Sequence, residues 1–522
     1  MLKRDISRTN VLIAAAGGMI GSGWLFSPFI SAQIAGSNAL ISWIIAAVFM
    51  LFIALPLCEL GAMFPISGGM TNYPSFTHGR DVGFLFAWTS WLSYVVMTPI
   101  EIQAILQYSG RLFPVLVAKD SVAFSLSLTG YLAAIFIMLF VVLLNSFGIK
   151  LLAECNRYAS IIKFLLPSIA IVALITSSPI MNNIHIHLTD TKAWEQIFSA
   201  LSVGGIAFAF TGFQNGLMLA GEVVDPQRNI PIAILGAVLI GFILYFMLQF
   251  GFLVAVPGQY LSHGWQHLTF PGDTGPLVGL MVLVGFVWIA ILLMADAMIS
   301  PFGTTLVYTA ATSRIVYGMA LNHYLPDVFT KLNKYKIPYV TLYANFLVGA
   351  LSFLPFPGWQ KMVAFLSSCS ILSYGIGPIC LLAMRTLQPD RLRPFKLSYS
   401  VFFSHLAFYV CNLMLYWCGF DILWKLDVAL VMGLAINLVY QKRNLFSCGW
   451  SFVWFAGYMS TLLLLSYLGS FGGIQVLTFP VDVVIILPFS VLMLYFSQRV
   501  LVDGMSSQYC VAPPLLAELI DS

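Results

Sequence analysis

The sequence predicts an all-α polytopic membrane protein. Of its 522 residues, 60% are hydrophobic and only 8% are charged, whereas a soluble protein carries about 25% charged residues. A soluble fold has no way to bury so much apolar surface, so we expect the chain to lie in a lipid bilayer. The apolar runs lack the alternation of a barrel strand, which leaves helices as the spanning elements. The net charge of +4 is too small to indicate a nucleic acid partner.

About fourteen apolar runs follow one another along the chain, each long enough for the roughly 20 residues that a spanning helix needs. The first run follows Lys3, Arg4 and Arg8 and is too long for a signal peptide, so we interpret it as a retained helix. The eighth is unusually long, and its first part is either a helix of an outer loop or a span of its own. The runs are 10–34, 39–64, 83–110, 128–147, 155–178, 196–222, 230–256, 277–318, 338–356, 362–384, 398–419, 422–440, 450–470 and 479–498.

The loops predict the orientation. Placing the N-terminus in the cytoplasm puts most of the 24 basic residues on the cytoplasmic side, as the positive-inside rule requires. We therefore expect a multi-pass protein of the cell membrane with both termini cytoplasmic. The predicted organisation is a ten-helix core over 1–384, with repeats at about 10–178 and 196–384. Four further helices over 397–498 and a short cytoplasmic tail over 499–522 follow.

Two of the runs carry helix breakers near their middle. "AAAGGMIGSGWLFSP" (14–28) lies in the first run and "GGIAFAFTGFQNG" (204–216) in the sixth. Glycine-interrupted segments at corresponding positions of two halves indicate a transporter site built on inverted repeats. An unwound turn in the membrane leaves backbone groups unpaired, which costs several kcal/mol each unless a ligand, water or protein group satisfies them. The alternative is that these glycines only allow close helix packing.

The two breaks predict opposite poles. After a break at Gly21, Ser22 and Gly23, the next half-helix starts near Trp24 and presents N–H groups, which favour an anion by about 0.3–2 kcal/mol. The sixth run is antiparallel to the first, so carbonyl groups near Phe208 to Phe210 favour a cation. A carboxylate pole that faces an ammonium pole indicates an α-amino acid as ligand.

Four ordered blocks carry a resemblance to the amino acid–polyamine–organocation (APC) superfamily of transporters. They are "GGMIGSGWLFSP" (17–28), "LCELGAMFPISGGMTNYPSF" (57–76), "AFAFTGFQNGLMLAGEVVDPQRNIPIAI" (207–234) and "SRIVYGMALNHYLPDVF" (313–329). The stretch "ADAMISPFGTTLVYTAATSR" (295–314) further resembles a branch that includes aspartate–proton symporters.

The resemblance implies a five-plus-five inverted-repeat core of the leucine-transporter type, with discontinuous helices 1 and 6 and four peripheral helices. It also implies that Phe208 is an aromatic lid. The family often has Glu where Gln214 stands, and an amide does not titrate. The resemblance places Ile20, Gly21, Ser22 and Gly23 at the substrate carboxylate and Phe208, Ala209, Phe210 and Thr211 at its amino group. Trp24 and Gln214 are further predicted substrate-binding residues.

Three ionisable residues in the apolar runs are predicted to take part in proton coupling. An intramembrane lysine is a functional hypothesis by default, and Lys163 matches a position where the resemblance implies a lysine in place of a bound sodium ion. Thr304 and Thr305 are expected near it. The alternative is a lysine that extends its amine to the cytoplasmic surface. Glu101 and Asp296 either relay protons or contact a substrate amine, or pair with buried hydroxyls. Glu59, at the inner end of the second run, is expected to be structural.

These observations predict a secondary amino acid transporter, with proton-coupled symport by alternating access as the first hypothesis and amino acid exchange as the alternative. A non-transporting nutrient receptor and a membrane-embedded enzyme are the remaining hypotheses. No Walker motif, GxSxG or metal-ligand cluster occurs, so we expect no catalytic residue, no metal and no cofactor. Because Lys163 is expected to carry the coupling proton, H+ is the expected driving ion. The substrate's charge class and the oligomeric state stay open.

Overall fold

The computed structural model describes residues 4–66, 69–118, 125–147, 149–177, 183–270, 275–356, 358–443 and 448–502, with the backbone alone for 149–161. Within these residues the regular structure is helical, and β-structure is limited to isolated bridges such as the one between Ile6 and Val223. The predicted tail over 499–522 lies outside the described residues from 503 onward.

The helices of the first half fall on the first seven predicted apolar runs. They are α1 (Arg8–Met19), α2 (Gly23–Ala35), α3 (Ala39–Met63), α4 (Gly69–Ser109), α5 (Leu128–Ser146), α6 (Ile149–Ser177), α7 (Thr191–Val203), α8 (Ile206–Ala209), α9 (Asn215–Met218) and α10 (Pro226–Ala255).

The helices of the second half follow the remaining runs. They are α11 (Pro276–Leu283), α12 (Val287–Leu321), α13 (Tyr339–Leu351), α14 (Trp359–Tyr374), α15 (Ile376–Leu387), α16 (Ser400–Trp417), α17 (Phe420–Gln441), α18 (Trp450–Leu468) and α19 (Val481–Ser497). The long eighth run thus begins with the separate short helix α11, which a turn at Gly285 (φ 86°) divides from α12.

Nine helical stretches of the described chain are long and apolar enough to cross a membrane, and three shorter apolar helices accompany them. Two of the nine, Gly23–Met63 and Trp359–Leu387, each join two of the helices named above. The chain is therefore a multi-pass helical membrane protein. The count of about fourteen spans and the five-plus-five repeat stay predictions.

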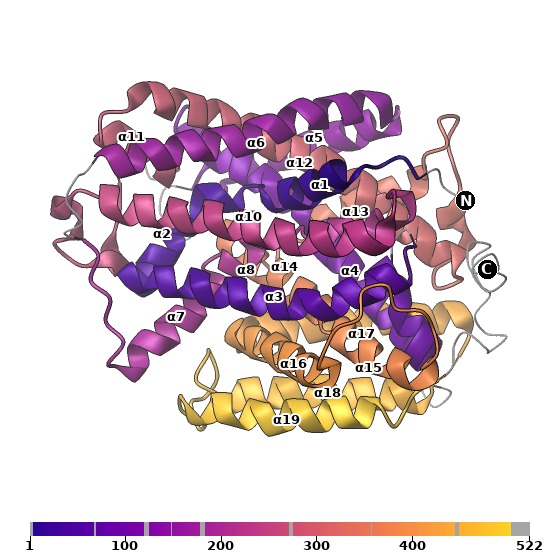
Figure 1. Cartoon of the computed structure of the whole chain (residues 1–522). Helices are drawn as coiled ribbons and strands as arrows, with labels where there is room; N and C mark the ends of the chain where they lie inside the picture. The colour runs from indigo at the N-terminus through magenta and orange to yellow at the C-terminus, as the bar shows by residue number, and fades with distance from the viewer. Residues whose placement is uncertain are drawn as a thin grey trace.

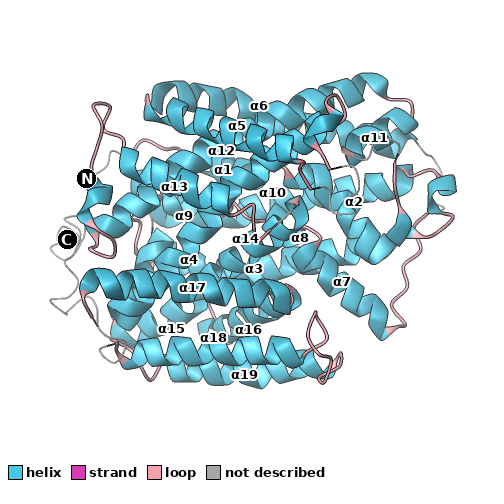
Figure 2. Ribbon diagram, turned by 180° about the vertical axis from the view of Figure 1, so that it is seen from behind, coloured by secondary structure: helices cyan, strands magenta, loops and turns pink. Residues whose placement is uncertain are grey.

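Helix α10 and helix α4, which a kink at Gly79 (φ 79°) interrupts, organise the packing. Helix α4 packs along α12 and α14, whereas α10 packs along α3, α1 and α6. Figures 1 and 2 show α5 and α6 along one side of the molecule and α18 and α19 along the opposite side. We call the end of the molecule where α1 begins the α1 end, and the end toward which α2 runs the α2 end.

Both predicted helix breaks are present. Between α1 and α2, Ile20 takes an extended conformation (φ −93°, ψ 90°). In the sixth run, Gly205 (φ 87°) precedes α8, and Gly212 (φ 130°) lies between α8 and α9. A Cβ atom on Gly212 would lie only 2.5 Å from the Gly18 oxygen and the Met19 nitrogen. The two broken helices therefore touch through their backbones, which only glycine at 212 allows.

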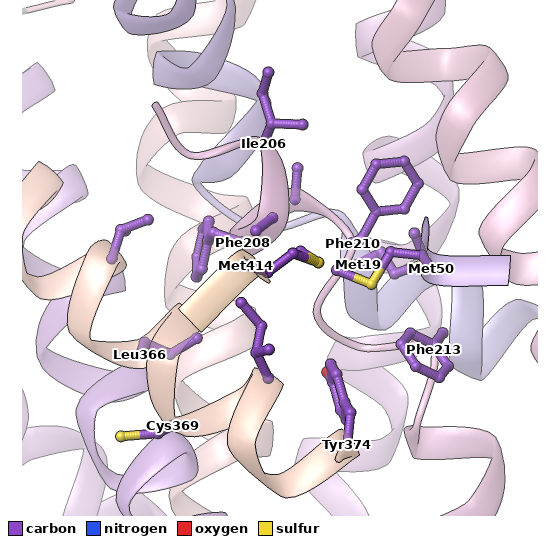
Figure 3. Packing of buried hydrophobic residues seen from close by; sticks show 14 of the residues in the cluster. Met19, Met50, Ile206, Phe208, Phe210, Phe213, Leu366, Cys369, Tyr374 and Met414 are labelled. Carbon is purple, nitrogen blue, oxygen red and sulfur yellow. The ribbon is translucent and has the colours of Figure 1, made fainter. Parts of the chain in front are cut away.

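The residues around the second break point in different directions. Figure 3 shows Phe208 and Phe210 extending differently from the same short segment, and Phe213 beside Tyr374. The ring centroids of Phe213 and Tyr374 lie 5.0 Å apart. This segment therefore contacts helices on several sides at once.

Replacing Gly212 by alanine is expected to lower the free energy of unfolding by about 2–4 kcal/mol, because overpacking and a positive φ each cost about 1–3 kcal/mol. The measurement is the melting temperature of the purified protein in detergent. Gly318→Ala is the matched control, since a Cβ there meets nothing within 4 Å and alanine favours the helix. Equal melting temperatures for the two variants would contradict the close contact.

Candidate functional site at the helix breaks

A buried carboxylate caps the N-terminus of α2. The backbone N–H of Ser22 donates to both oxygens of Glu101, at 3.1 and 3.0 Å, and the Ser22 hydroxyl donates to Oε1 at 3.2 Å. Glu101 comes from α4 and is fully buried. A Cβ on Gly21 would lie 2.5 Å from Oε1, so the glycine leaves room for the carboxylate. An anion at a helix N-terminus is stabilised by the N–H groups and the helix dipole.

The contact between Glu101 and Ser22 differs from what was expected at the first break. The N–H groups of the break were expected to bind a substrate carboxylate, but in this structure the Ser22 N–H binds the carboxylate of Glu101. Glu101 was predicted as an ionisable group near the middle of its run, but its position against the break was not. The substrate roles of Ile20, Gly21, Ser22 and Gly23 remain predictions, and all four residues are buried beside Glu101 or on the adjoining turn.

Trp359 lies over the same break. Its indole N–H donates to the Ser22 hydroxyl oxygen at 2.9 Å. Its ring lies 4.8 Å from that of Phe26 on α2 and 5.7 Å from that of Phe208 on α8. The sequence did not indicate Trp359, because this residue lies just before the tenth apolar run and belongs to no motif.

Side chains from other helices satisfy two carbonyl groups at the breaks. The Tyr245 hydroxyl of α10 donates to the Met19 carbonyl at 2.8 Å, and the Ser27 hydroxyl of α2 donates to the Gly205 carbonyl at 3.1 Å. These bonds replace the intrahelical ones that each break removes.

Gln214 supports the second break from within. Its amide oxygen accepts from the Gly212 N–H at 2.7 Å and from the Tyr374 hydroxyl at 2.9 Å. A carboxylate at this position would accept the same two bonds, so the exchange of the family's Glu for Gln keeps the geometry and removes the charge. The predicted contact of Gln214 with substrate stays a prediction.

The other predicted residues of the second break lie in two directions. Phe208 packs against the start of α2, since a Cβ on Gly23 would lie 3.2 Å from its ring. Phe210 packs instead on Trp43, with ring centroids 5.9 Å apart, and Ala209 between them is fully buried. The Thr211 hydroxyl donates to the Phe208 carbonyl.

Trp24 extends from the first turn of α2 and is fully buried. Its indole N–H has no hydrogen-bond partner among the described residues. The substrate role of Trp24 remains a prediction.

Lys163 and Asp296 bring two more ionisable groups into the interior. The Lys163 amine, only 4% exposed, donates to the Thr304 hydroxyl of α12 at 2.7 Å. Thr305 turns to its own helix and donates to the Pro301 carbonyl at 2.8 Å. Asp296 is 2% exposed, and neither of its oxygens has a hydrogen-bond partner among the described residues. Lys163 interacts electrostatically with both Glu101 and Asp296.

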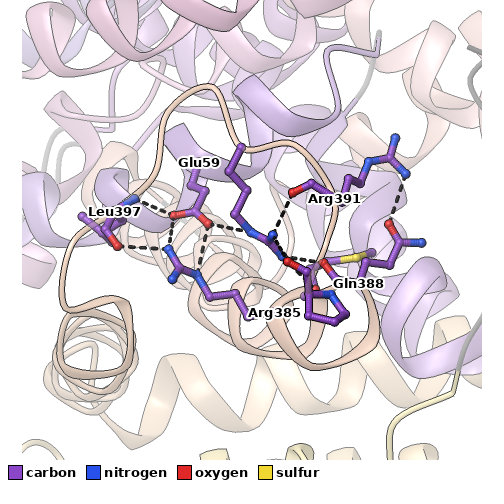
Figure 4. A network of polar contacts seen from close by, with 8 residues as sticks. Glu59, Arg385, Gln388, Arg391 and Leu397 are labelled. Atoms are coloured by element: carbon purple, nitrogen blue, oxygen red, sulfur yellow. Dashed lines mark hydrogen bonds and ion pairs between the residues drawn. The ribbon is translucent and has the colours of Figure 1, made fainter.

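The buried carboxylate of Glu59 lies near the α1 end, away from the breaks. Glu59 of α3 accepts from Arg385 at 2.7 and 3.1 Å and from the Leu397 N–H at 2.7 Å (Figure 4). The Nε atom of Arg393 lies 3.4 Å from Oε1 of Glu59. Figure 4 also shows the adjacent bond from Arg391 to Gln388. Glu59 therefore joins α3 to α15 and to the segment that leads into α16, which agrees with its expected structural role.

These features define a helical membrane protein in which two interrupted helices meet at buried ionisable side chains. Sequence comparison matches residues 6–436 to the amino acid permease family, and the chain belongs to that family within the APC superfamily. The resemblance drawn from the motifs is confirmed.

Characterised relatives cover nearly the whole chain. The glutamate/serine transporter AimA of Bacillus subtilis (strain 168) is 34% identical over 520 residues, which span 97% of this chain and 95% of that protein. The aspartate-proton symporter of the same organism is 32% identical over 509 residues, 95% of this chain and 96% of that protein. Its branched-chain amino acid permease BcaP is 25% identical over 462 residues, 85% and 94% of the two chains. The family and these relatives point to an amino acid transporter rather than an enzyme.

Replacing Glu59 by glutamine is expected to lower the free energy of unfolding by about 3–5 kcal/mol, because breaking a buried ion pair leaves uncompensated charges. Arg385 and Arg393 are 24% and 8% exposed in their side chains. Asp421→Asn is the control: that carboxylate is 63% exposed and pairs with Lys425, and a surface pair is worth about 0–1 kcal/mol. Thermal unfolding of both purified variants measures the difference in stability between them. A Glu59 variant as stable as the Asp421 variant would contradict the structural role of the Glu59 ion pairs.

Proposed function

We propose that the protein is a proton-coupled amino acid symporter of the cell membrane that works by alternating access. The observation that carries the proposal is the Glu101 carboxylate bound to the N–H and hydroxyl of Ser22 at the N-terminus of α2. The same groups are the ones expected to hold the α-carboxylate of an amino acid.

Glu101 and the substrate carboxylate compete for the N–H and hydroxyl of Ser22. Two carboxylates about 4 Å apart repel each other by about 4 kcal/mol at the effective dielectric constant of a partly polar protein interior. Protonation removes the charge from Glu101 and weakens its hold on Ser22. The substrate carboxylate then takes over the N-terminus of α2. Because each ligand favours the binding of the other, proton and amino acid bind together, which is a coupling free energy between two sites.

The charges of the interior favour one bound proton. Glu101 and Asp296 contribute two carboxylates and Lys163 contributes one amine, so one negative charge is left without a counter-charge when all three ionise. An uncompensated charge in a low-dielectric interior is expensive. One proton on a carboxylate restores neutrality, and Lys163, held by Thr304, stays as the fixed positive charge.

The ammonium group of the substrate is placed at the other break. The carbonyl end of α8, from Phe208 to Thr211, presents the partial negative charge of a helix C-terminus. Phe208 packs against Gly23 and so lies between the carboxylate pole and the α2 end. In the predicted orientation the α2 end faces the exterior, and Phe208 covers the substrate from that side.

The names of the relatives suggest which amino acids to test first. One relative is an aspartate-proton symporter and another is a glutamate/serine transporter. We therefore propose acidic and small polar amino acids as substrates and the proton as the driving ion.

Uptake into proteoliposomes tests the function. With an inward proton gradient, labelled aspartate, glutamate or serine is expected to accumulate above its external concentration, and a protonophore is expected to abolish the accumulation. Counterflow without any gradient-driven accumulation would establish an exchanger and overturn symport. A failure of every amino acid both to be taken up and to raise the melting temperature would overturn amino acid transport itself.

Glu101→Gln is expected to lose gradient-driven accumulation by about tenfold, within the 5–150-fold range of typical couplings, while counterflow of the same amino acid persists. The amide no longer carries a proton through the cycle, but it no longer excludes the substrate carboxylate either. Glu195→Gln on α7, outside the breaks, is the control and should behave as wild type. Unchanged accumulation in the Glu101 variant would show that this carboxylate does not couple the proton.

A further inference from the structure

We propose that Trp359 is a latch that closes the site toward the α2 end only while an anion occupies the N-terminus of α2. The proposal rests on the function proposed above and deepens it, because it assigns a role to a residue outside the predicted substrate and proton groups. It comes from the contacts of Trp359 with both broken helices and from the direction of its hydrogen bond.

Trp359 bridges the two half-helices that lead to the α2 end. It is the first residue of α14 and follows Gly358, whose φ of 91° turns the chain into the helix. Its ring contacts Phe26 of α2 and Phe208 of α8. A Cβ on Gly205 would lie 3.1 Å from the same ring. With 1% of its surface exposed, Trp359 is enclosed by these partners.

The hydrogen bonds around Ser22 run in one direction. An indole N–H only donates, so the Ser22 hydroxyl oxygen accepts from Trp359. The same hydroxyl has one proton, which it donates to Glu101. The chain of hydrogen bonds therefore runs from Trp359 to Ser22 and from Ser22 to the anion, which only accepts.

This order makes the latch depend on the anion. A carboxylate at the N-terminus of α2 directs the Ser22 proton toward itself and leaves the lone pairs of the hydroxyl for the indole. Bonds to an ionised acceptor are about twice as strong as neutral ones, and bonds in a chain strengthen one another. Ionised Glu101 supplies the anion in the empty site, and the substrate carboxylate supplies it in the loaded site.

Without an anion at the N-terminus of α2, the hydrogen bond from Trp359 to Ser22 is weaker. When Glu101 is protonated and no substrate is bound, the Ser22 hydroxyl loses its charged acceptor. The site then stays open toward the α2 end and does not carry the proton across alone. The dependence of the latch on an anion thus prevents proton leak and sets the ratio of protons to amino acids.

Proton entry into proteoliposomes that contain a pH-sensitive dye tests the latch. Trp359→Phe keeps an aromatic ring but lacks the N–H. We expect amino acid-driven proton entry to fall by roughly three- to tenfold, the factor by which one lost hydrogen bond shifts a two-state equilibrium, because the loaded site closes less readily. Proton entry without substrate should stay at the low wild-type level. Trp454→Phe is the matched control, since its indole donates to the Met493 carbonyl at 2.8 Å in the C-terminal helices.

Ser22→Ala is the second variant and keeps the proposal falsifiable if Trp359→Phe does not fold. It removes only the hydroxyl between Trp359 and the anion, and the same fall in amino acid-driven proton entry is expected. Wild-type amino acid-driven proton entry in a folded variant of either residue would overturn the latch. If the wild type itself shows no amino acid-dependent proton entry, the proposed symport fails. A coupled wild type with unaltered variants defeats the latch alone.

Discussion

The structure depends on one constraint: backbone groups freed by a helix break inside an apolar protein must find new partners. An unpaired amide in such an environment costs several kcal/mol. At the first break, Tyr245 satisfies the Met19 carbonyl and Glu101 satisfies the Ser22 N–H. At the second break, Ser27 satisfies the Gly205 carbonyl and Gln214 satisfies the Gly212 N–H. The partners come from α10, α4 and α2 and from the break itself, so the breaks determine how these helices are placed around the centre.

The same constraint concentrates charge at the centre. A helix N-terminus that lies in the interior is best satisfied by an anion, and α4 supplies one in Glu101. A buried anion in turn needs counter-charge, and Lys163 provides it from α6 while Thr304 holds the amine in place. Each polar group at the centre is thus a partner of the next. The N-terminus of α2 needs the carboxylate of Glu101, this carboxylate needs the amine of Lys163, and the amine needs the hydroxyl of Thr304 as its acceptor.

The sequence predicted the local features of this arrangement and missed the contacts that complete it. Apolar runs and glycine clusters are local patterns, so the helices and both breaks could be placed from residues close together in the chain. Ser22 and Glu101 are 79 residues apart, and Ser22 and Trp359 are 337 residues apart. No periodicity within one run indicates which distant side chain meets a break. Gln214 was assigned to the substrate for the same reason, because the chain alone does not show that its oxygen already accepts from Gly212 and Tyr374. The substrate roles at both breaks remain predictions.

Glu59 and Glu101 are both buried carboxylates, but they differ in what holds them. Glu59 is bound by Arg385 and Arg393, so its departure would leave two positive charges without a counter-charge. Glu101 is bound at Ser22 by an uncharged N–H and an uncharged hydroxyl. Another carboxylate that takes its place restores the same bonds, and protonated Glu101 carries no charge that needs compensation. The ion pairs at Glu59 therefore resist exchange, whereas the exchange of carboxylates proposed at Ser22 would leave no such charge behind. A carrier needs both properties at once: a scaffold that keeps its ion pairs and a site whose anion is replaceable.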